Sequence, residues 1–139
     1  MQFVDQTEYG EVGNCLTACI ASLLAIPITE LPNHQGEDWL ERWNHELARY
    51  NAHLIEIADP EAVQPGYSIL SGLSPRGRWA HSVICYNGEM VHDPHEDRTG
   101  IRKGKRIEWL VLRPLDPSKL MGSSGAPGTH KAPAGLPDL

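Results

Sequence analysis

The sequence predicts an α+β fold in which two helices come first and a mainly antiparallel sheet follows. One observation is a run that starts after Asn14 and is apolar on nearly every side, and another is a repeat of apolar residues at helical spacing between residues 40 and 50. The third is that short segments rich in β-forming residues alternate with turn residues from residue 52 onwards. At 139 residues the chain has the length of one domain.

The first predicted helix covers residues 15–26. Asn14 is a favourable N-cap residue, and Pro27 cannot continue the helix. Because this helix is apolar all round, it belongs in the interior of the domain. The second predicted helix covers residues 37–50, and its apolar stripe is formed by Leu40, Trp43, Leu47 and Tyr50.

Turn residues divide the rest of the domain into short strands, and Asn87-Gly88 is a dipeptide typical of hairpins. The predicted strands are residues 52–58, 66–73, 79–86, 89–93 and 107–113. After Pro114 the chain is rich in glycine, proline and serine and has too few large apolar residues to build a core. We therefore expect residues 1–115 to form the domain and residues 116–139 to form a C-terminal tail.

Charge and composition exclude several classes of partner. The net charge of −6 disfavours nucleic acid, because affinity for phosphate backbones comes mainly from lysine and arginine. No apolar run approaches the length of a membrane-spanning helix, so no membrane partner is expected. The first residues lack the basic and apolar regions of a secretory signal, and three cysteines do not make a disulfide framework. We therefore expect a cytoplasmic protein.

Neither group of possible metal ligands has the pattern of a binding site. Cys15 and Cys19 lie one helical turn apart, but no second pair of cysteines or histidines at zinc-like spacing accompanies them. A second group consists of His92, Asp93, His95 and Asp97. Pro94 and Gly100 mark this region as a turn, where clusters of short polar residues are common. We expect no metal and no cofactor.

Cys15 is the candidate nucleophile. It lies in the first turn of a predicted helix, where unpaired N–H groups and the helix dipole favour the thiolate form. The glycine-containing loop before it can bring main-chain N–H groups to an oxyanion, and the side-chain amide of Gln6 can add a donor. These surroundings suit acyl transfer, whereas a cysteine without such surroundings usually packs as a small apolar residue.

A histidine enters the predicted hairpin and an aspartate leaves it, so the register of the hairpin decides whether His81 and Asp93 meet. A two-residue turn at Asn87-Gly88 puts their side chains on opposite faces and makes His92 the alternative partner of His81. A three-residue loop over residues 86–88 pairs Val83 with Val91 and His81 with Asp93. In that second register the carboxylate can orient the imidazole.

The sequence resembles papain-like cysteine peptidases over about residues 3–101. The resemblance is closest to the bacteriocin-processing, leader-cleaving peptidase domains, and small bacterial and phage proteins share the pattern. Gln6 lies farther from Cys15 than is usual in those peptidases. The segments that carry the resemblance are Gln6, Gly13-Asn14-Cys15, Ala80-His81-Ser82-Val83-Ile84, Asn87-Gly88 and Val91-His92-Asp93-Pro94.

The resemblance implies a papain-like fold, with the buried N-terminal helix that bears the cysteine packed on the sheet. It also implies a catalytic triad of Cys15, His81 and Asp93, with Gln6 as an oxyanion donor. The expected activity is hydrolysis of a peptide or isopeptide bond in a peptide or protein substrate through an acyl-enzyme. Two alternatives remain: a transamidase or deamidase with the same triad, and an inactive papain-like protein that binds a host or partner protein.

Overall fold

The computed structural model describes residues 2–122, in which the helices precede the strands along the chain, as predicted. Two α-helices are present, α1 (Cys15–Leu24) and α2 (Trp39–Leu47). Three 3-10 turns accompany them: η1 (Gly10–Val12), η2 (Ile28–Glu30) and η3 (Ala48–Tyr50). The strands are β1 (Ala52–Ile57), β2 (Tyr67–Leu73), β3 (Ala80–Tyr86), β4 (Glu89–His92) and β5 (Arg106–Pro114).

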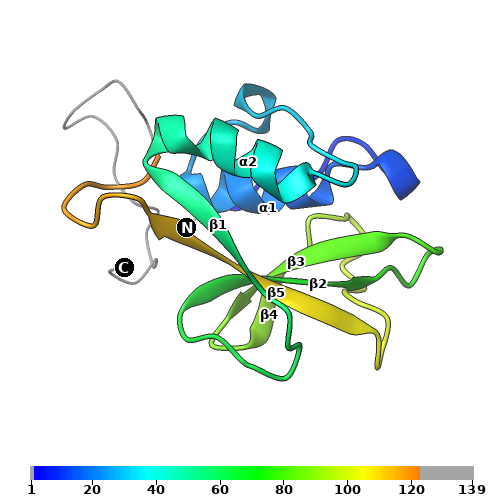
Figure 1. Ribbon diagram of the computed structural model, residues 1–139. Coiled ribbons are helices and arrows are strands. Elements are labelled where there is room, and N and C mark those ends of the chain that lie inside the picture. Colours follow the sequence, from blue (N-terminus) through cyan, green and yellow to red (C-terminus); the bar gives the residue numbers. More distant parts are fainter. Residues whose placement is uncertain (1, 123–139) are drawn as a thin grey trace.

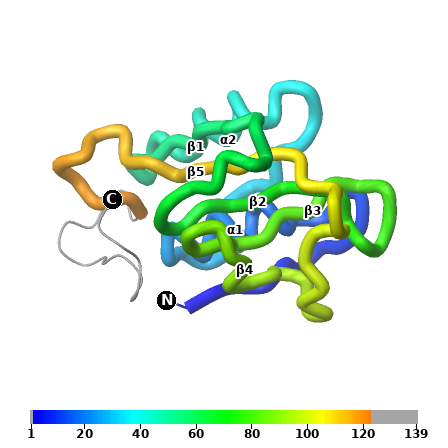
Figure 2. The backbone as a smooth tube through the Cα atoms, turned by 90° about the horizontal axis from the view of Figure 1, so that it is seen from below, coloured from blue at the N-terminus to red at the C-terminus, as the bar shows by residue number. Residues whose placement is uncertain are grey.

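The five strands form one sheet in the order β1-β5-β2-β3-β4, and every neighbouring pair is antiparallel. The last strand of the chain, β5, lies between β1 and β2 and therefore joins two distant parts of the sequence. Both helices lie on the same side of the sheet (Figure 1). The tube view places β4 at one edge of the sheet, next to the N-terminal segment (Figure 2). The α+β class predicted from the sequence is confirmed.

Side chains alternate between two apolar clusters, one on each face of the sheet. The larger cluster fills the space under the helices and includes Ile20, Trp43 and Ile84. The smaller cluster lies on the opposite face and includes Val83 and Trp109.

The ends of both helices differ slightly from the predicted ones. The first helix ends at Leu24 because Ala25 adopts a left-handed conformation, with a φ of 58°, two residues before Pro27. The second begins at Trp39 and continues as the tighter turn η3. Asn51 follows η3 in the left-handed conformation with a φ of 56°, which is typical of a C-terminal cap.

The segment after β5 is attached to the domain by the side chain of Asn51, whose amide donates to the carbonyls of Asp116 and Lys119 at 3.1 Å. Met121 packs against the larger core cluster, and the N–H of Gly122 donates to the carbonyl of Tyr50. The predicted tail is therefore attached to the domain at several points up to Gly122. The remainder of that prediction, residues 123–139, lies outside the described residues. Within residues 2–122, no helix is long and apolar enough to cross a membrane.

Candidate active site

The hairpin between β3 and β4 has a two-residue turn. Tyr86 pairs with Glu89, and the two residues between them, Asn87 and Gly88, have φ angles of 51° and 88°. Two consecutive positive φ values are typical of the type I′ turn that Asn-Gly favours. The three-residue loop considered from the sequence is therefore wrong.

A shift of register farther along the hairpin brings Asp93 to the face of His81. Cys85 pairs with Met90, but the next residue, Ile84, pairs with His92, so that Val91 is an extra residue on β4. One extra residue reverses the face on which all later side chains lie. The predicted direct pairing of His81 with Asp93 across the strands is therefore wrong, yet the bulge lets their side chains meet.

His81 and Asp93 form a buried hydrogen bond of 2.7 Å between Nε2 and Oδ1. The same carboxylate accepts the N–H of His95 at 2.9 Å and the N–H of Gly100 at 2.7 Å. Burial raises the pKa of Asp93, but the hydrogen bonds from His81, His95 and Gly100 outweigh it and lower the pKa to about 2. The carboxylate is thus ionised at neutral pH and can only accept, so Nε2 of His81 is the donor.

The alternative orienting residue, His92, is directed away from His81. Its Nε2 lies 3.0 Å from Oδ1 of Asp5, and its ring stacks on Phe3 at 4.7 Å between centroids. Asp5 also forms a two-contact ion pair with Arg98, which donates in addition to the carbonyl of Asp93. These contacts fasten the N-terminal segment to the loop that carries Asp93.

Cys15 is the first residue of α1 and the only partly exposed thiol, because Cys19 and Cys85 are buried. Asn14 occupies the N-cap position, but its side chain does not cap the helix. Its Oδ1 instead accepts the N–H groups of Thr7 and Glu8, both at 2.9 Å. The predicted position of Asn14 is confirmed and its predicted capping role is wrong. The N–H groups in the first turn of α1 are consequently available to another acceptor.

The imidazole of His81 interacts with both partners of the predicted triad. Burial lowers the pKa of His81, but the hydrogen bond with Asp93 and the nearby Cys15 thiol outweigh it and raise the pKa to about 9. Because Nε2 is bonded to Asp93, Nδ1 is the nitrogen that remains for the thiol. The structure therefore brings Cys15, His81 and Asp93 together.

Gln6 is buried near this cluster, but its side chain is used within its own loop. Its Nε2 donates to the carbonyl of Glu8 at 2.8 Å, and its Oε1 has no hydrogen-bond partner. Its backbone N–H donates to the carbonyl of Pro94, the residue after Asp93. Gln6 is not among the residues that line the pocket beside Cys15.

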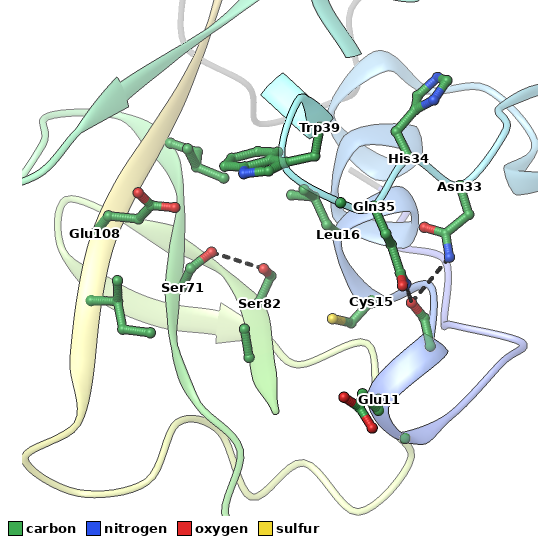
Figure 3. A pocket seen from close by; sticks show the side chains of 16 residues that line it. Glu11, Cys15, Leu16, Asn33, His34, Gln35, Trp39, Ser71, Ser82 and Glu108 are labelled. Carbon is green, nitrogen blue, oxygen red and sulfur yellow. Dashed lines mark hydrogen bonds between the residues drawn. The ribbon is translucent and has the colours of Figure 1, made fainter. Parts of the chain in front are cut away.

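A pocket of about 280 Å³ opens beside Cys15 (Figure 3). Leu16 and Trp39 line it from the helices, and polar residues of the sheet form its floor. The amides of Gln35 and Asn33, at 3.0 and 3.2 Å from the carbonyl of Gly13, fix the loop at its rim. The polar floor, which the sequence reasoning missed, consists of Ser71, Ser82 and Glu108.

The floor residues are neighbours across three strands. Ser71 of β2 pairs with Ser82 of β3 on one side and with Glu108 of β5 on the other. The two serine hydroxyls are 2.9 Å apart. The alternation of side chains along each strand could have predicted which face each residue is on. That the three residues lie side by side depends on the position of β5 in the sheet.

The described histidines, cysteines and acidic residues do not form a group of three or more that could hold a metal ion. His95, one of the residues considered as a ligand, lies against other rings instead. Its ring centroid is 5.1 Å from that of Tyr9 and 6.4 Å from that of His81.

The chain was compared with protein-family models, with curated proteins and with solved structures, and it matches none of them.

Proposed function

We propose that this protein is a cysteine-dependent hydrolase that cleaves an amide bond of a peptide or protein through an acyl-enzyme on Cys15. The observation that carries the proposal is the buried 2.7 Å bond between His81 and Asp93, with the Cys15 thiol, at a helix start, near the same imidazole. The pocket beside Cys15 offers room for the substrate. The sequence resemblance to papain-like peptidases supports the same chemistry.

In the first half of the proposed reaction, Nδ1 of His81 takes the proton of the Cys15 thiol, and the thiolate attacks the carbonyl carbon of the substrate. The tetrahedral intermediate then collapses, the C–N bond breaks, and the imidazolium gives its proton to the departing amine. A pKa of about 9 for His81 keeps the imidazole protonated when it is paired with the thiolate at neutral pH.

In the second half, His81 takes a proton from water while the water oxygen attacks the thioester carbon. The C–S bond breaks, the carboxylic acid leaves, and the proton returns to Cys15. Asp93 accepts the Nε2 hydrogen throughout and so fixes the tautomer and the orientation of the ring.

The negative oxygen of the intermediate is assigned to the first-turn N–H groups of α1, including that of Cys15. The first helical hydrogen bond is donated by Ala18 to the carbonyl of Asn14, so the N–H groups before Ala18 have no partner within the helix. Gln6 can contribute a donor only if its amide leaves the carbonyl of Glu8. We therefore give the backbone the main role.

The proposal is tested by labelling with an electrophilic amide probe that reacts only with an activated thiolate. We expect the wild-type protein to be labelled at Cys15 and Cys15→Ala to remain unlabelled. Cys85→Ala is the matched control, because Cys85 is buried on the opposite face of the sheet and should not affect labelling. A wild-type protein that does not react, while its circular dichroism shows it to be folded, contradicts the proposal and favours a binding protein.

Acyl transfer to an amine is separated from hydrolysis by mass spectrometry of the products. With a cleavable peptide amide and an added primary amine, hydrolysis gives a product with a free carboxylate. A product that is mainly the new amide would show a transamidase with the same triad.

A further inference from the structure

The pocket beside Cys15 has an acidic end, and no lysine or arginine among residues 2–122 forms an ion pair with it. Glu108 lies at the far side of the pocket from Cys15, with Ser71 and Ser82 between them (Figure 3). Glu56 of β1 lies near Glu108, close enough to raise the pKa of its carboxyl group. Among the ion pairs in residues 2–122, none involves Glu56 or Glu108, and the pocket lining contains no lysine or arginine.

The surroundings hold Glu108 in an unfavourable state that a cation would relieve. Burial and the neighbouring carboxyl group of Glu56 raise the pKa of Glu108 to about 8. A cation entering the pocket would favour the ionised carboxylate and would replace the proton as the partner of Glu108. No group within the described chain has this role.

Two neighbouring serine hydroxyls in the pocket have each other as hydrogen-bond partners. Ser71 and Ser82 are both more than nine-tenths buried as residues, and a single bond of 2.9 Å joins their hydroxyls. One hydroxyl donates to the other, which leaves one O–H hydrogen without an acceptor in this pair. Because both residues line the pocket, this hydrogen is available to a group of a bound ligand, such as a peptide carbonyl.

The walls of the pocket fit the stem of a long side chain. Leu16, Trp39, Ile107 and Leu110 supply apolar surface to the lining of the pocket. Methylene groups of lysine and arginine pack on such surfaces while the charged end reaches a polar group. The pocket thus combines an apolar passage, a free hydroxyl donor and an acidic end.

We infer that this pocket holds the side chain of an arginine or lysine residue beside the scissile amide, with Glu108 binding its cationic end. The inference rests on the proposed function, which supplies the position of the scissile bond at Cys15. It extends that function by naming the substrate class, which is a basic peptide or protein segment.

The test uses peptide-coumarin amides in pairs that differ only in charge, arginine against its neutral isostere citrulline and lysine against norleucine. The charged residue is placed at each of the two positions before the amide in turn. For the wild-type protein we expect kcat/KM to be about tenfold higher for the better-placed charged substrate, because a charge-assisted contact replaces a neutral one. Glu108→Gln should remove this preference, and Glu89→Gln, an exposed glutamate on β4, should retain it.

Binding to Cys15→Ala, measured by calorimetry with the matching free peptides, gives a readout that does not require turnover. Arginine-selective binding that is lost in Glu108→Gln supports the inference, and equal binding of the arginine and citrulline peptides contradicts it. If Cys15 is labelled by the electrophilic probe but the charged and neutral substrates are cleaved equally, the inference fails and the proposed function stands. If Cys15 is not labelled, the proposed function fails and the binding measurement alone decides the inference.

Discussion

Cys15 and Cys19 lie one turn apart on α1, but their surroundings have opposite chemistry. Cys15 is partly exposed beside a pocket and near the imidazole of His81, whereas Cys19 is fully buried among apolar side chains. Burial raises the pKa of the Cys19 thiol well above its usual value. Two identical residues on one helix thus become a candidate nucleophile and an inert core residue, because the helix passes from the rim of the domain into its interior.

The same division runs along β3. Ile84 and Cys85 lie where β4 still pairs with the strand, and they pack in the two apolar clusters. His81 lies beyond the last pair with β4, where the loop carrying Asp93 replaces the missing strand. The proposed catalytic residues therefore lie where the regular pairing of β3 with β4 ends, and the core residues lie where that pairing continues.

The largest loss of activity is expected from a substitution of Asp93, the carboxylate that orients His81. Asp93→Asn should reduce kcat/KM about 10⁴-fold, because an amide no longer fixes the catalytic tautomer. It should also lower the free energy of unfolding by about 1–3 kcal/mol, because the amide N–H₂ opposes one of the N–H donors of His95 and Gly100. Kinetics and urea unfolding measure the two losses. Asp38→Asn, an exposed control, should change neither, and near-normal turnover in Asp93→Asn would remove Asp93 from the mechanism.

A substitution in the interior part of α1 should lower stability strongly and leave the reactivity of Cys15 almost unchanged. Ile20→Ala should lower the free energy of unfolding by about 2–5 kcal/mol, because Ile20 is fully buried and its truncation leaves a cavity. The labelling rate of Cys15 in the remaining folded protein should stay within about twofold, because the two residues lie on different turns. A large loss of labelling with little loss of stability would show that the two regions are not separate.

The pH dependence of stability distinguishes the charged site from the core. The pKa of His81 rises from 6.5 to about 9 on folding, so its contribution is complete below pH 6.5 and is lost as the pH rises through 9. The pKa of Asp93 falls from 3.8 to about 2, so its contribution is present above pH 3.8 and is lost as the pH falls through 2. These two groups together favour stability most between pH 3.8 and 6.5, and the raised pKa of Glu108 adds a further fall as the pH rises above 4.5 towards 8.

Urea unfolding at pH 5, 7 and 9.5 checks the alkaline half of this profile. The fall in stability between pH 5 and 9.5 should be clearly smaller in His81→Gln than in the wild-type protein. An unchanged slope in that variant would mean that another group is responsible.

The smallest effect is expected from removal of residues 123–139. This segment has few large apolar residues, whereas Met121 and Gly122 still contact the domain. Truncation after Gly122 should change the melting temperature by no more than about 2 °C. Truncation after Pro114 is the comparison and should lower it further, because it removes the segment bonded to Asn51. A large fall on the first truncation would assign these residues a structural role.

Local signals along the chain were sufficient to predict most of the fold. Pro27 and the apolar run before it placed the first helix, and Asn87-Gly88 placed the hairpin turn. The contact between His81 and Asp93 was predicted from a three-residue hairpin loop, which is wrong. The contact arises instead from a bulge at Val91, which no turn residue in the sequence indicates. A bulge depends on how two strands pack in the whole sheet, and the alternation of a short strand does not reveal it.

The pocket was harder to predict because it is built from long-range contacts. Glu108 meets Ser71 only because β5 inserts between β1 and β2, an order that pairs strands more than thirty residues apart in the sequence. The side chain of Asn14 likewise bonds to the loop at Thr7 rather than to its own helix, since the folded loop presents two N–H groups to it. Neither arrangement follows from a local pattern.

The central claim is that His81 activates Cys15, and the rate of alkylation at each cysteine tests it most directly. Partial reaction with iodoacetamide near neutral pH, resolved by mass spectrometry, compares Cys15 with the buried Cys19 and Cys85 in one sample. We predict that Cys15 reacts at least about tenfold faster than the other two, and that His81→Ala slows Cys15 alone. Equal rates at all three cysteines, or a Cys15 rate unaffected by His81→Ala, would contradict the account.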